Sequence, residues 1–549
     1  MFSSVKKASD LILKHDALVI ALFLSILFLQ SLRHIDLPGL NADEAIVGMG
    51  SGYILNIFRP PQSHWGERLG GRFFPVMENQ YTSALPSYLV SPFFKFLGAD
   101  LISIRLMSIL LSMITLVYVY RLCKTLFGPM TAMTVVLLAG THPAFAIFHK
   151  MASTVSEVYL ACFFWAAAFH LTLAYERRSR LHLCAGAFFV GLGLNKITFL
   201  WYIAAFVAMA FLFGKRFPRR PELPVRDMIP AVLAFALGSS LMLYFNLRSH
   251  GTTLRLLVQN LFSLTPNGFN NLDYPSNLLL RLGHFISGIL QGTDIGMGTF
   301  YRLKGPFRLF HSFFALSFAA GLASLFYLKV VRKSLADGGE RVLFWTGMMV
   351  FILLCSPFTV SELYCHHLYT VFPIPQMIVA FFLCKVIGGS GTRYWRVGTA
   401  ALICAALLGS QLHLSGYYAR QLRETGGLNP YSRHVAQLAD YLDQHSRRAP
   451  VIVDSIKYSL VFLRRGRGRR MIDRTELQPD QFKEKLAELV LKAEEFYFVV
   501  NYPSDEGYHY RREFKDLLER ARAAKRHIEI VKNIYSDNDD LVFEVYRFS

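Results

Sequence analysis

The residues best suited to acid–base chemistry are Asp43 and Glu44, in the segment Asn41-Ala-Asp43-Glu44-Ala45, which closely follows a first apolar run. Carboxylates near lipid are costly to desolvate unless they bind a cation or act as a base. An acid here could accept a proton from an attacking hydroxyl group. A helix N-terminus, capped by Asn41 or Asp43 with acids in its first turn, would explain the same residues. The two interpretations are compatible, because a cap also fixes a side chain.

Three cations and a third acid could complete a site with these carboxylates. Lys196 lies at the outer end of two apolar runs, where it either binds a phosphate or extends to the membrane interface. The same two readings apply to Arg105, which opens an apolar run. Glu157 follows Lys150 by two helical turns and either pairs with it or holds an acceptor or a cation.

A metal site is the weaker possibility. His64, His366 and Glu362 lie in expected outer segments, but their spacing matches no strong metal signature. The seven cysteines form no CxxC pair. No cofactor is therefore assigned, and a divalent cation remains possible.

The elements that must position these residues are transmembrane helices. The chain has 549 residues, of which 53% are hydrophobic and only 17% charged, against about a quarter charged in soluble domains. The fold class is therefore a polytopic α-helical membrane protein. Eleven candidate spans follow from the apolar runs: 17–32, 101–120, 130–148, 155–175, 181–194, 197–213, 228–245, 307–327, 342–357, 368–387 and 397–414. The fifth and sixth are short, and are either two helices meeting at Asn195-Lys196 or one broken element.

Charge sets the expected orientation. With the N-terminus in the cytoplasm, the cytoplasmic segments collect Lys and Arg, while the short outer loops hold only Lys150 and Lys196. This topology explains the net charge of +20 without a nucleic-acid partner. Domain 1–415 then carries outer loops 33–100 and 246–306, and 416–549 forms a soluble extracytoplasmic domain.

The C-terminal 416–549 segment has the pattern of a small α/β domain. Strands are expected at 451–454, 496–500, 528–531 and 541–545, and helices at 431–446, 478–495 and 506–524. No nucleotide-binding fingerprint occurs in it, and the chain has no P-loop.

Several ordered motifs over about residues 17–415 resemble the GT-C membrane glycosyltransferases, especially the protein O-mannosyltransferase and aminoarabinose-transferase type. These are the Asp43-Glu44 pair, Ala84-Leu-Pro-Ser-Tyr88, Ile104-Arg105-Leu106, Tyr120 to Phe127-Gly128, Gly191 to Lys196, and His367-Leu-Tyr369 to Pro373. There are departures: Lys150 stands where many relatives have Arg, Glu157 where the second acid is often Asp, and the interfacial Pro-Pro pair is reduced to single prolines.

The resemblance implies an inverting transfer of a sugar from a polyprenyl-phosphate donor to a protein, lipid A or glycan acceptor. It implies catalytic roles for Asp43, Glu44 and Glu157, and donor-phosphate binding by Lys196, Arg105 and Lys150. Substrate-binding roles would fall to Tyr88, His367 and Tyr369. The expected location is the outer face of a bacterial inner membrane, with membrane lipid as a further partner.

Two other function classes remain open at this stage. A transporter or flippase of a lipid-linked sugar would be expected to show repeats and polar residues at mid-membrane, and neither is evident. A non-catalytic relative would use the outer α/β domain as a binding module. Loss of transfer on substitution of Asp43 separates the enzyme from both.

Overall fold

A computed structural model describes most of the chain. The described residues are 15–60, 65–150, 155–214, 225–261, 263, 270–293, 307–331, 338–358, 365–388, 394–427, 431–446, 449–454, 456–464, 471–474, 477, 479–502 and 508–549.

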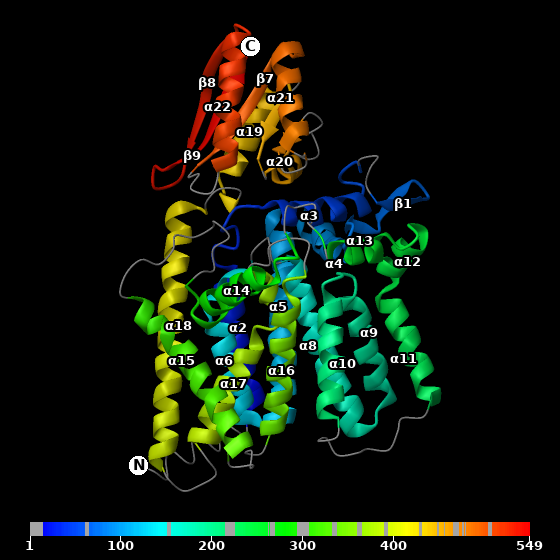
Figure 1. Cartoon of the computed structure of the whole chain (residues 1–549), viewed down its shortest axis with the longest axis vertical. Helices are drawn as coiled ribbons and strands as arrows, with labels where there is room; N and C mark the ends of the chain where they lie inside the picture. Colours follow the sequence, from blue (N-terminus) through cyan, green and yellow to red (C-terminus); the bar gives the residue numbers. More distant parts are fainter. Residues whose placement is uncertain are drawn as a thin grey trace.

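The lower part of the molecule is a bundle of apolar helices, and each of the eleven expected segments contains a helix (Figure 1). The bundle contains α2 (Asp16–Leu32), α5 (Leu101–Phe127), α6 (Pro129–Thr141), α7 (Pro143–Phe148), α8 (Val155–Arg177), α9 (Arg180–Gly193), α10 (Phe199–Phe213), α11 (Val225–Gly238), α15 (Phe307–Phe326), η3 (Tyr327–Val331), α16 (Gly339–Cys355), α17 (Pro373–Phe381), η5 (Phe382–Ile387) and α18 (Tyr394–Thr425). Helix α12 (Ser240–Arg248) follows α11 and lies above it, among the short elements described below. The 368–387 segment departs most, because its helix α17 begins only at Pro373, after turns at 369–372. The fifth and sixth segments are two separate helices, α9 and α10.

Two expected spans are interrupted. The 130–148 segment breaks before Pro143, whose ring cannot continue the hydrogen-bond ladder of α6. The 228–245 segment bends by 72° between α11 and α12. By length and composition, four of the described helices can cross a membrane, or five if the bent pair is one span. The expected count of eleven spans is therefore not established.

A layer of short elements lies between the bundle and the C-terminal domain (Figure 1). The 33–100 segment contributes α3 (Ala42–Ile54), β1 (Gly66–Leu69), β2 (Arg72–Pro75), β3 (Met77–Asn79), β4 (Thr82–Ser83) and α4 (Leu85–Leu97). Later segments contribute α13 (Thr252–Leu261), α14 (Tyr274–His284), η2 (Phe285–Leu290) and η4 (Cys365–Leu368). β1 pairs with β2, and β3 with β4, both antiparallel.

The C-terminal domain is a five-stranded mixed sheet in the order β6-β5-β7-β9-β8. Its elements are α19 (Val435–His445), β5 (Val451–Val453), α20 (Lys457–Leu463), β6 (Met471–Asp473), α21 (Pro479–Lys492), β7 (Phe496–Asn501), α22 (Tyr508–Ala523), β8 (Ile528–Tyr535) and β9 (Leu541–Phe548). Separate apolar clusters form on the two faces of the sheet, one with α19 and α20 and the other with α21 and α22. The four expected strands and three expected helices are present; α20 and β6 were not anticipated.

The domain boundary lies later than expected. Helix α18 continues without a break to Thr425, so position 415/416 falls inside a helix and the sheet domain starts with Tyr431 and α19. The apolar run ends near Leu414, whereas helix α18 continues to Thr425 with a more polar sequence.

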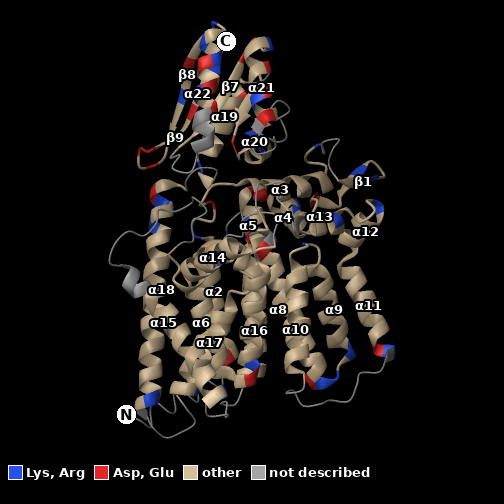
Figure 2. Cartoon of the chain, viewed as in Figure 1, with Lys and Arg blue, Asp and Glu red and all other residues tan. Residues whose placement is uncertain are grey.

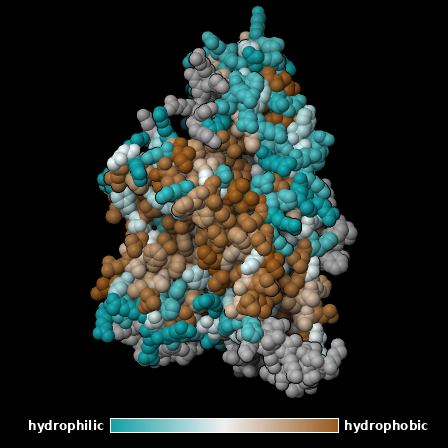
Figure 3. All heavy atoms as spheres, turned by 180° about the vertical axis from the view of Figure 1, so that it is seen from behind, coloured by the Kyte–Doolittle hydropathy of each residue, from teal (hydrophilic) through white to brown (hydrophobic). Residues whose placement is uncertain are grey.

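The surface of the molecule separates into hydrophobic and hydrophilic zones. Acidic and basic residues concentrate at the ends of the bundle and in the sheet domain (Figure 2). On the face shown in Figure 3, a broad hydrophobic band covers the helical part between hydrophilic ends. This distribution is the one required of a bundle whose helices face lipid.

Candidate active site

The acid pair begins helix α3. Asn41 has extended backbone angles, and its side chain accepts a hydrogen bond from the Glu44 amide at 3.0 Å, which makes Asn41 the N-cap. Asp43 and Glu44 occupy the first turn, where carboxylates interact favourably with the helix dipole. The capping interpretation of this motif is confirmed, and it fixes the direction of both acids.

Glu44 and Arg105 form a closed, fully buried ion pair. Arg105 Nε lies 3.0 Å from Glu44 Oε1 and Nη2 lies 3.2 Å from Oε2, so the guanidinium binds the carboxylate with two donors. The same guanidinium donates to the carbonyls of Ile35 at 2.7 Å and Gly39 at 3.1 Å. Both charged side chains have no exposed surface. Arg105 therefore ties the end of the first span to α3 and α5. The phosphate-binding role expected for it stays a prediction.

Asp43, unlike its neighbour Glu44, is accessible to solvent although protein surrounds it, so it lies in a recess. Its side chain is accessible to solvent, yet burial by the surrounding protein raises its pKa above the ordinary value. Lys196 and His367 act electrostatically to lower this pKa, whereas Glu157 acts to raise it. Asp43 thus shares one wet recess with residues from three other parts of the chain.

Glu157, Lys196 and His367, which lie within electrostatic range of Asp43, contact one another. The Lys196 ammonium makes an ion pair with Glu157 Oε1, and His367 Nδ1 lies 3.0 Å from the same oxygen. Glu157 and Lys196 side chains are almost entirely buried, while His367 is 24% exposed. Glu157 is therefore partnered by Lys196, and not by Lys150 as one reading of the sequence had it. A small cavity of about 20 Å³ is lined by Glu157 and His367 together with Thr198, Trp201, Tyr202, Ile352, Ser356 and Leu368.

The turn between α9 and α10 holds Lys196 in place. Asn195 donates to the Gly238 carbonyl at 2.8 Å and accepts, through its own carbonyl, from the Ser83 amide at 2.8 Å. The Ile197 amide donates to the Tyr81 carbonyl at 3.0 Å. Lys196 is thereby fastened to the outer segment that also carries α3 and Asp43.

Glu78 is a further acid of the recess that the sequence did not single out. It accepts a hydrogen bond from Ser87 Oγ at 3.0 Å, and burial raises its pKa to about 8. Asp43 contributes to this rise, while Lys196 opposes it. The only signal in the sequence was its place just before the interfacial helix α4.

Three other expected site residues lie elsewhere. Lys150 is half-buried and within electrostatic range of Arg105 and Asp36, apart from the Asp43 recess. The Tyr88 hydroxyl donates to the Pro75 carbonyl at 3.0 Å. Tyr369 is buried, donates to Ser112 Oγ at 3.3 Å and stacks on Phe372. Both tyrosine hydroxyls therefore have partners within the protein.

The residues suggested for a metal are largely outside the described structure. This applies to His64, Glu362 and the side chain of His366. Among the described residues, no three His, Cys, Asp or Glu side chains are grouped to hold a metal ion.

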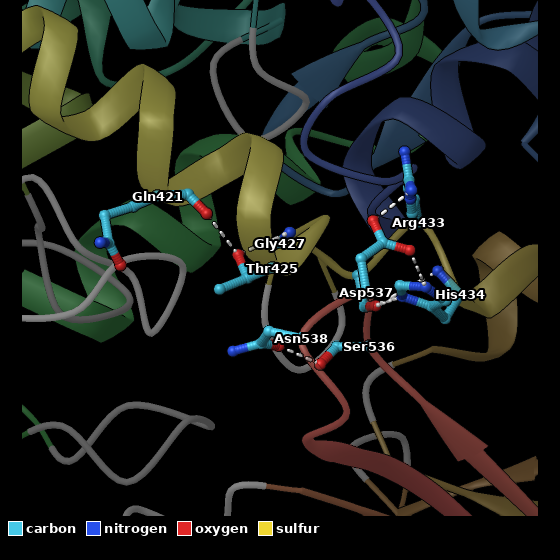
Figure 4. A network of polar contacts seen from close by, with 9 residues as sticks. Gln421, Thr425, Gly427, Arg433, His434, Ser536, Asp537 and Asn538 are labelled. Atoms are coloured by element: carbon cyan, nitrogen blue, oxygen red, sulfur yellow. Dashed lines mark hydrogen bonds and ion pairs between the residues drawn. The ribbon is translucent and has the colours of Figure 1, made fainter.

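The C-terminal domain packs directly on the segment that leads to Asp43. The Gly39 amide donates to the Tyr431 carbonyl at 2.6 Å, and a Cβ added at Gly39 would come within 2.2 Å of the Ser432 carbonyl oxygen. In Figure 4, Asp537 of the β8–β9 loop lies between Arg433 and His434; it forms an ion pair with Arg433 and its Oδ1 is 3.3 Å from His434 Nε2.

A second contact comes from α20. Phe462 is buried against α3 and α4, with its ring centroid 5.6 Å from Phe58 and 6.2 Å from Phe94. A Cβ at Gly48 would lie 2.5 Å from the Phe462 ring, so the glycine permits this close approach. The sheet domain therefore supports α3 on the side opposite the bundle.

Comparison with known proteins agrees with this architecture. Residues 83–244 match the dolichyl-phosphate-mannose-protein mannosyltransferase family. The fold is similar to ArnT from Cupriavidus metallidurans in the apo state, with a TM-score of 0.54 and 12% identity over 97% of both chains. ArnT bound to undecaprenyl phosphate gives 0.52 and 11%, again over 97% of both chains.

A third similar structure is an oligosaccharyltransferase. The Archaeoglobus fulgidus enzyme, tethered with an acceptor peptide, gives a TM-score of 0.52 and 13% identity over 97% of this chain and 74% of its own. Curated protein sequences give no significant match. The chain has the fold of the GT-C membrane glycosyltransferases, and the resemblance drawn from its motifs is confirmed.

Proposed function

We propose that this protein transfers a sugar from a polyprenyl-phosphate donor to an acceptor hydroxyl or amine in the cell envelope. The observation that carries the proposal is the recess in which accessible Asp43 faces the Glu157–Lys196–His367 group. A base and a cation within electrostatic range of each other suit a displacement that releases an anionic leaving group. The undecaprenyl phosphate bound by ArnT, a protein of similar fold, supports this donor class.

In the proposed reaction, Asp43 accepts the proton of the acceptor as the acceptor attacks the anomeric carbon of the sugar. The new bond joins that carbon to the acceptor, and the bond to the phosphate oxygen breaks with its electron pair. Lys196 neutralises the phosphate that departs, while Glu157 orients Lys196 and His367. A single displacement inverts the anomeric centre. Glu44 acts on Asp43 only indirectly, by fixing α3 through Arg105.

The reaction is proposed to occur on the outer face of a bacterial inner membrane. The support is the distribution of Lys and Arg along the sequence, which favours a cytoplasmic N-terminus and an extracytoplasmic sheet domain. The acceptor is a protein, a lipid such as lipid A, or a glycan.

The test is a transfer assay in proteoliposomes with a panel of polyprenyl-phosphate sugars and crude envelope acceptors. Asp43→Asn should lower transfer by about 10²- to 10⁴-fold, because a general base is lost. Asp100→Asn is the matched control: Asp100 caps α5 in the same outer segment, and Asn caps equally well. Undiminished transfer by Asp43→Asn would contradict the assignment. Movement of lipid across the bilayer without transfer would support a flippase instead.

A further inference from the structure

A second cavity lies apart from the Asp43 recess, between α2, α7 and the outer half of α18. Its volume is about 610 Å³, within the roughly 300–1,000 Å³ typical of ligand pockets. It has no lining residue in common with the small cavity beside Glu157. We propose that this cavity binds one lipid with a phosphate-bearing headgroup, at a site distinct from the proposed catalytic recess.

Cations gather at the outer end of the cavity. Arg33 follows α2, Lys150 follows α7 and Arg423 lies near the end of α18, and all three line the space. No carboxylate is among the lining residues in the described part of the chain; Asp36 acts on Lys150 electrostatically from outside the lining. Three converging cations without a lining anion favour a phosphate headgroup.

The three cations also lack ion-pair partners. Within the described residues, no side-chain hydrogen bond or salt bridge is made by Arg33, Lys150 or Arg423. For Lys150 this matters most, because it is half-buried and burial lowers its pKa to about 8. A half-buried ammonium without a counter-ion is costly, and a bound anion would remove that cost.

The deeper end of the cavity is apolar. Leu27 of α2, Ile147 of α7 and Leu412 of α18 contribute to its wall. From Leu412 to Arg423 the axis of α18 advances by about 16 Å at the helical rise per residue. The cavity is cationic at its outer end and apolar further into the bundle. This pattern matches the charged headgroup and the first acyl segment of an amphiphilic lipid.

Substitution of Gly416 by a larger residue is a way to fill this cavity. Gly416 lines the cavity on α18, and a Cβ built there meets no atom within 4 Å. Leucine also favours the helical conformation more than glycine does. Gly416→Leu should therefore fold and occupy the cavity without changing its charge. Gly409→Leu, two turns lower on the same helix, is the matched control, because Gly409 has equal open space but does not line the cavity.

The experiment measures lipid binding by the purified full-length protein, with native mass spectrometry or a fluorescent-lipid displacement assay. The probes are phosphatidylglycerol, undecaprenyl phosphate and neutral undecaprenol. Undecaprenyl phosphate is measured in a Lys196→Met background, so that the proposed donor site does not contribute. The readout is binding alone, so its result is independent of whether the protein transfers a sugar.

Gly416→Leu and the double variant Arg33→Gln/Lys150→Gln should each weaken binding of a phosphate lipid at least tenfold, while Gly409→Leu leaves it unchanged. Binding of phosphatidylglycerol would identify a membrane phospholipid as the source, and selective binding of undecaprenyl phosphate a lipid of the proposed reaction; both support the site. Equal binding of undecaprenol, or binding unaffected by Gly416→Leu, would overturn the proposal. Thermal unfolding of each variant shows whether it is folded.

Discussion

The two buried carboxylate–cation groups of this protein consist of similar residues but differ in how accessible their partners are. Glu44 and Arg105 are wholly enclosed, and two backbone carbonyls complete the guanidinium's contacts. Glu157 and Lys196 are nearly as buried, but their third partner, His367, is partly exposed and Asp43 faces them across accessible space. The first group is closed to any ligand, whereas the second is open to one.

The difference shows why charge and burial alone do not mark a functional site. A buried ion pair whose donors and acceptors are all satisfied has nothing left to offer a substrate, and its removal leaves an uncompensated charge. An ion pair at the edge of a recess can exchange partners when an anion arrives. Lys196 belongs to the second kind and Arg105 to the first.

The comparison is tested most strongly by replacing Lys196 with methionine, which keeps length but removes charge. Transfer should fall by about 10²- to 10³-fold, because the departing phosphate loses its cation. The melting temperature should fall less than that of Arg105→Met, since Glu157 keeps the partly exposed His367 as a partner. Lys196→Arg should recover part of the rate. If Lys196→Met lowered transfer only because the protein unfolded, the Glu157–Lys196 pair would be a structural ion pair like Glu44–Arg105.

The matching substitution Arg105→Met should act in the opposite way. It leaves Glu44 buried without a counter-charge, which should lower the free energy of unfolding by about 3–5 kcal/mol. The double variant Arg105→Met/Glu44→Met removes both charges and should recover much of that stability. Thermal and denaturant unfolding in detergent measure both effects. A stable Arg105→Met protein would show that the pair is not the structural tie described here.

A third prediction concerns the packing of the sheet domain on α3, the helix that carries Asp43 and Glu44. Phe462→Ala removes the ring that packs on α3 and α4, and should cost about 3 kcal/mol in the docking of the sheet domain. Limited proteolysis should then release the domain after α18, and transfer should fall because α3 is less well held. Phe482→Ala, buried on the far face of the sheet, is the control. It should destabilise the domain without specifically exposing α3.

The smallest effect expected is the dependence of the free energy of unfolding on pH that Glu78 causes. Burial raises its pKa to about 8, so the folded state keeps a proton that the unfolded state releases near the ordinary value of 4.5. The free energy of unfolding should therefore fall as pH rises between these two values. Glu78→Gln should remove that slope, so that the variant gains a few degrees in melting temperature over the wild type at pH 9 and none at pH 4. Equal slopes in both proteins would contradict this.

Much of the fold could be predicted from the apolar runs and the charge pattern. Every expected apolar segment contains a helix, and the break before Pro143 has a clear local cause. The bend between α11 and α12 falls at Gly238-Ser239, a residue pair at which helices commonly kink. In the sheet domain, β6 and α20 are too short for periodicity to reveal.

The site was predictable in its residue types but not in its grouping. Asp43, Glu157, Lys196 and His367 were all singled out, and the structure brings them together. Arg105 and Lys150 carry the same charge as Lys196 and lie at similar depths, so sequence alone gave no reason to separate them. Arg105 is set apart by its contacts with Glu44 and with the carbonyls of Ile35 and Gly39, which arise from the fold and are not visible in the sequence.

The contact between Gly39 and residues 431–432 has a consequence for the order in which the protein is made. The segment leading to the acid pair emerges among the first parts of the chain, whereas its partners follow roughly 390 residues later. At 5–20 residues per second, that gap is on the order of 20–80 s of synthesis. The early segment must therefore wait before its last neighbour is made. Until then, the segment that leads to Asp43 lacks its contact with residues 431–432.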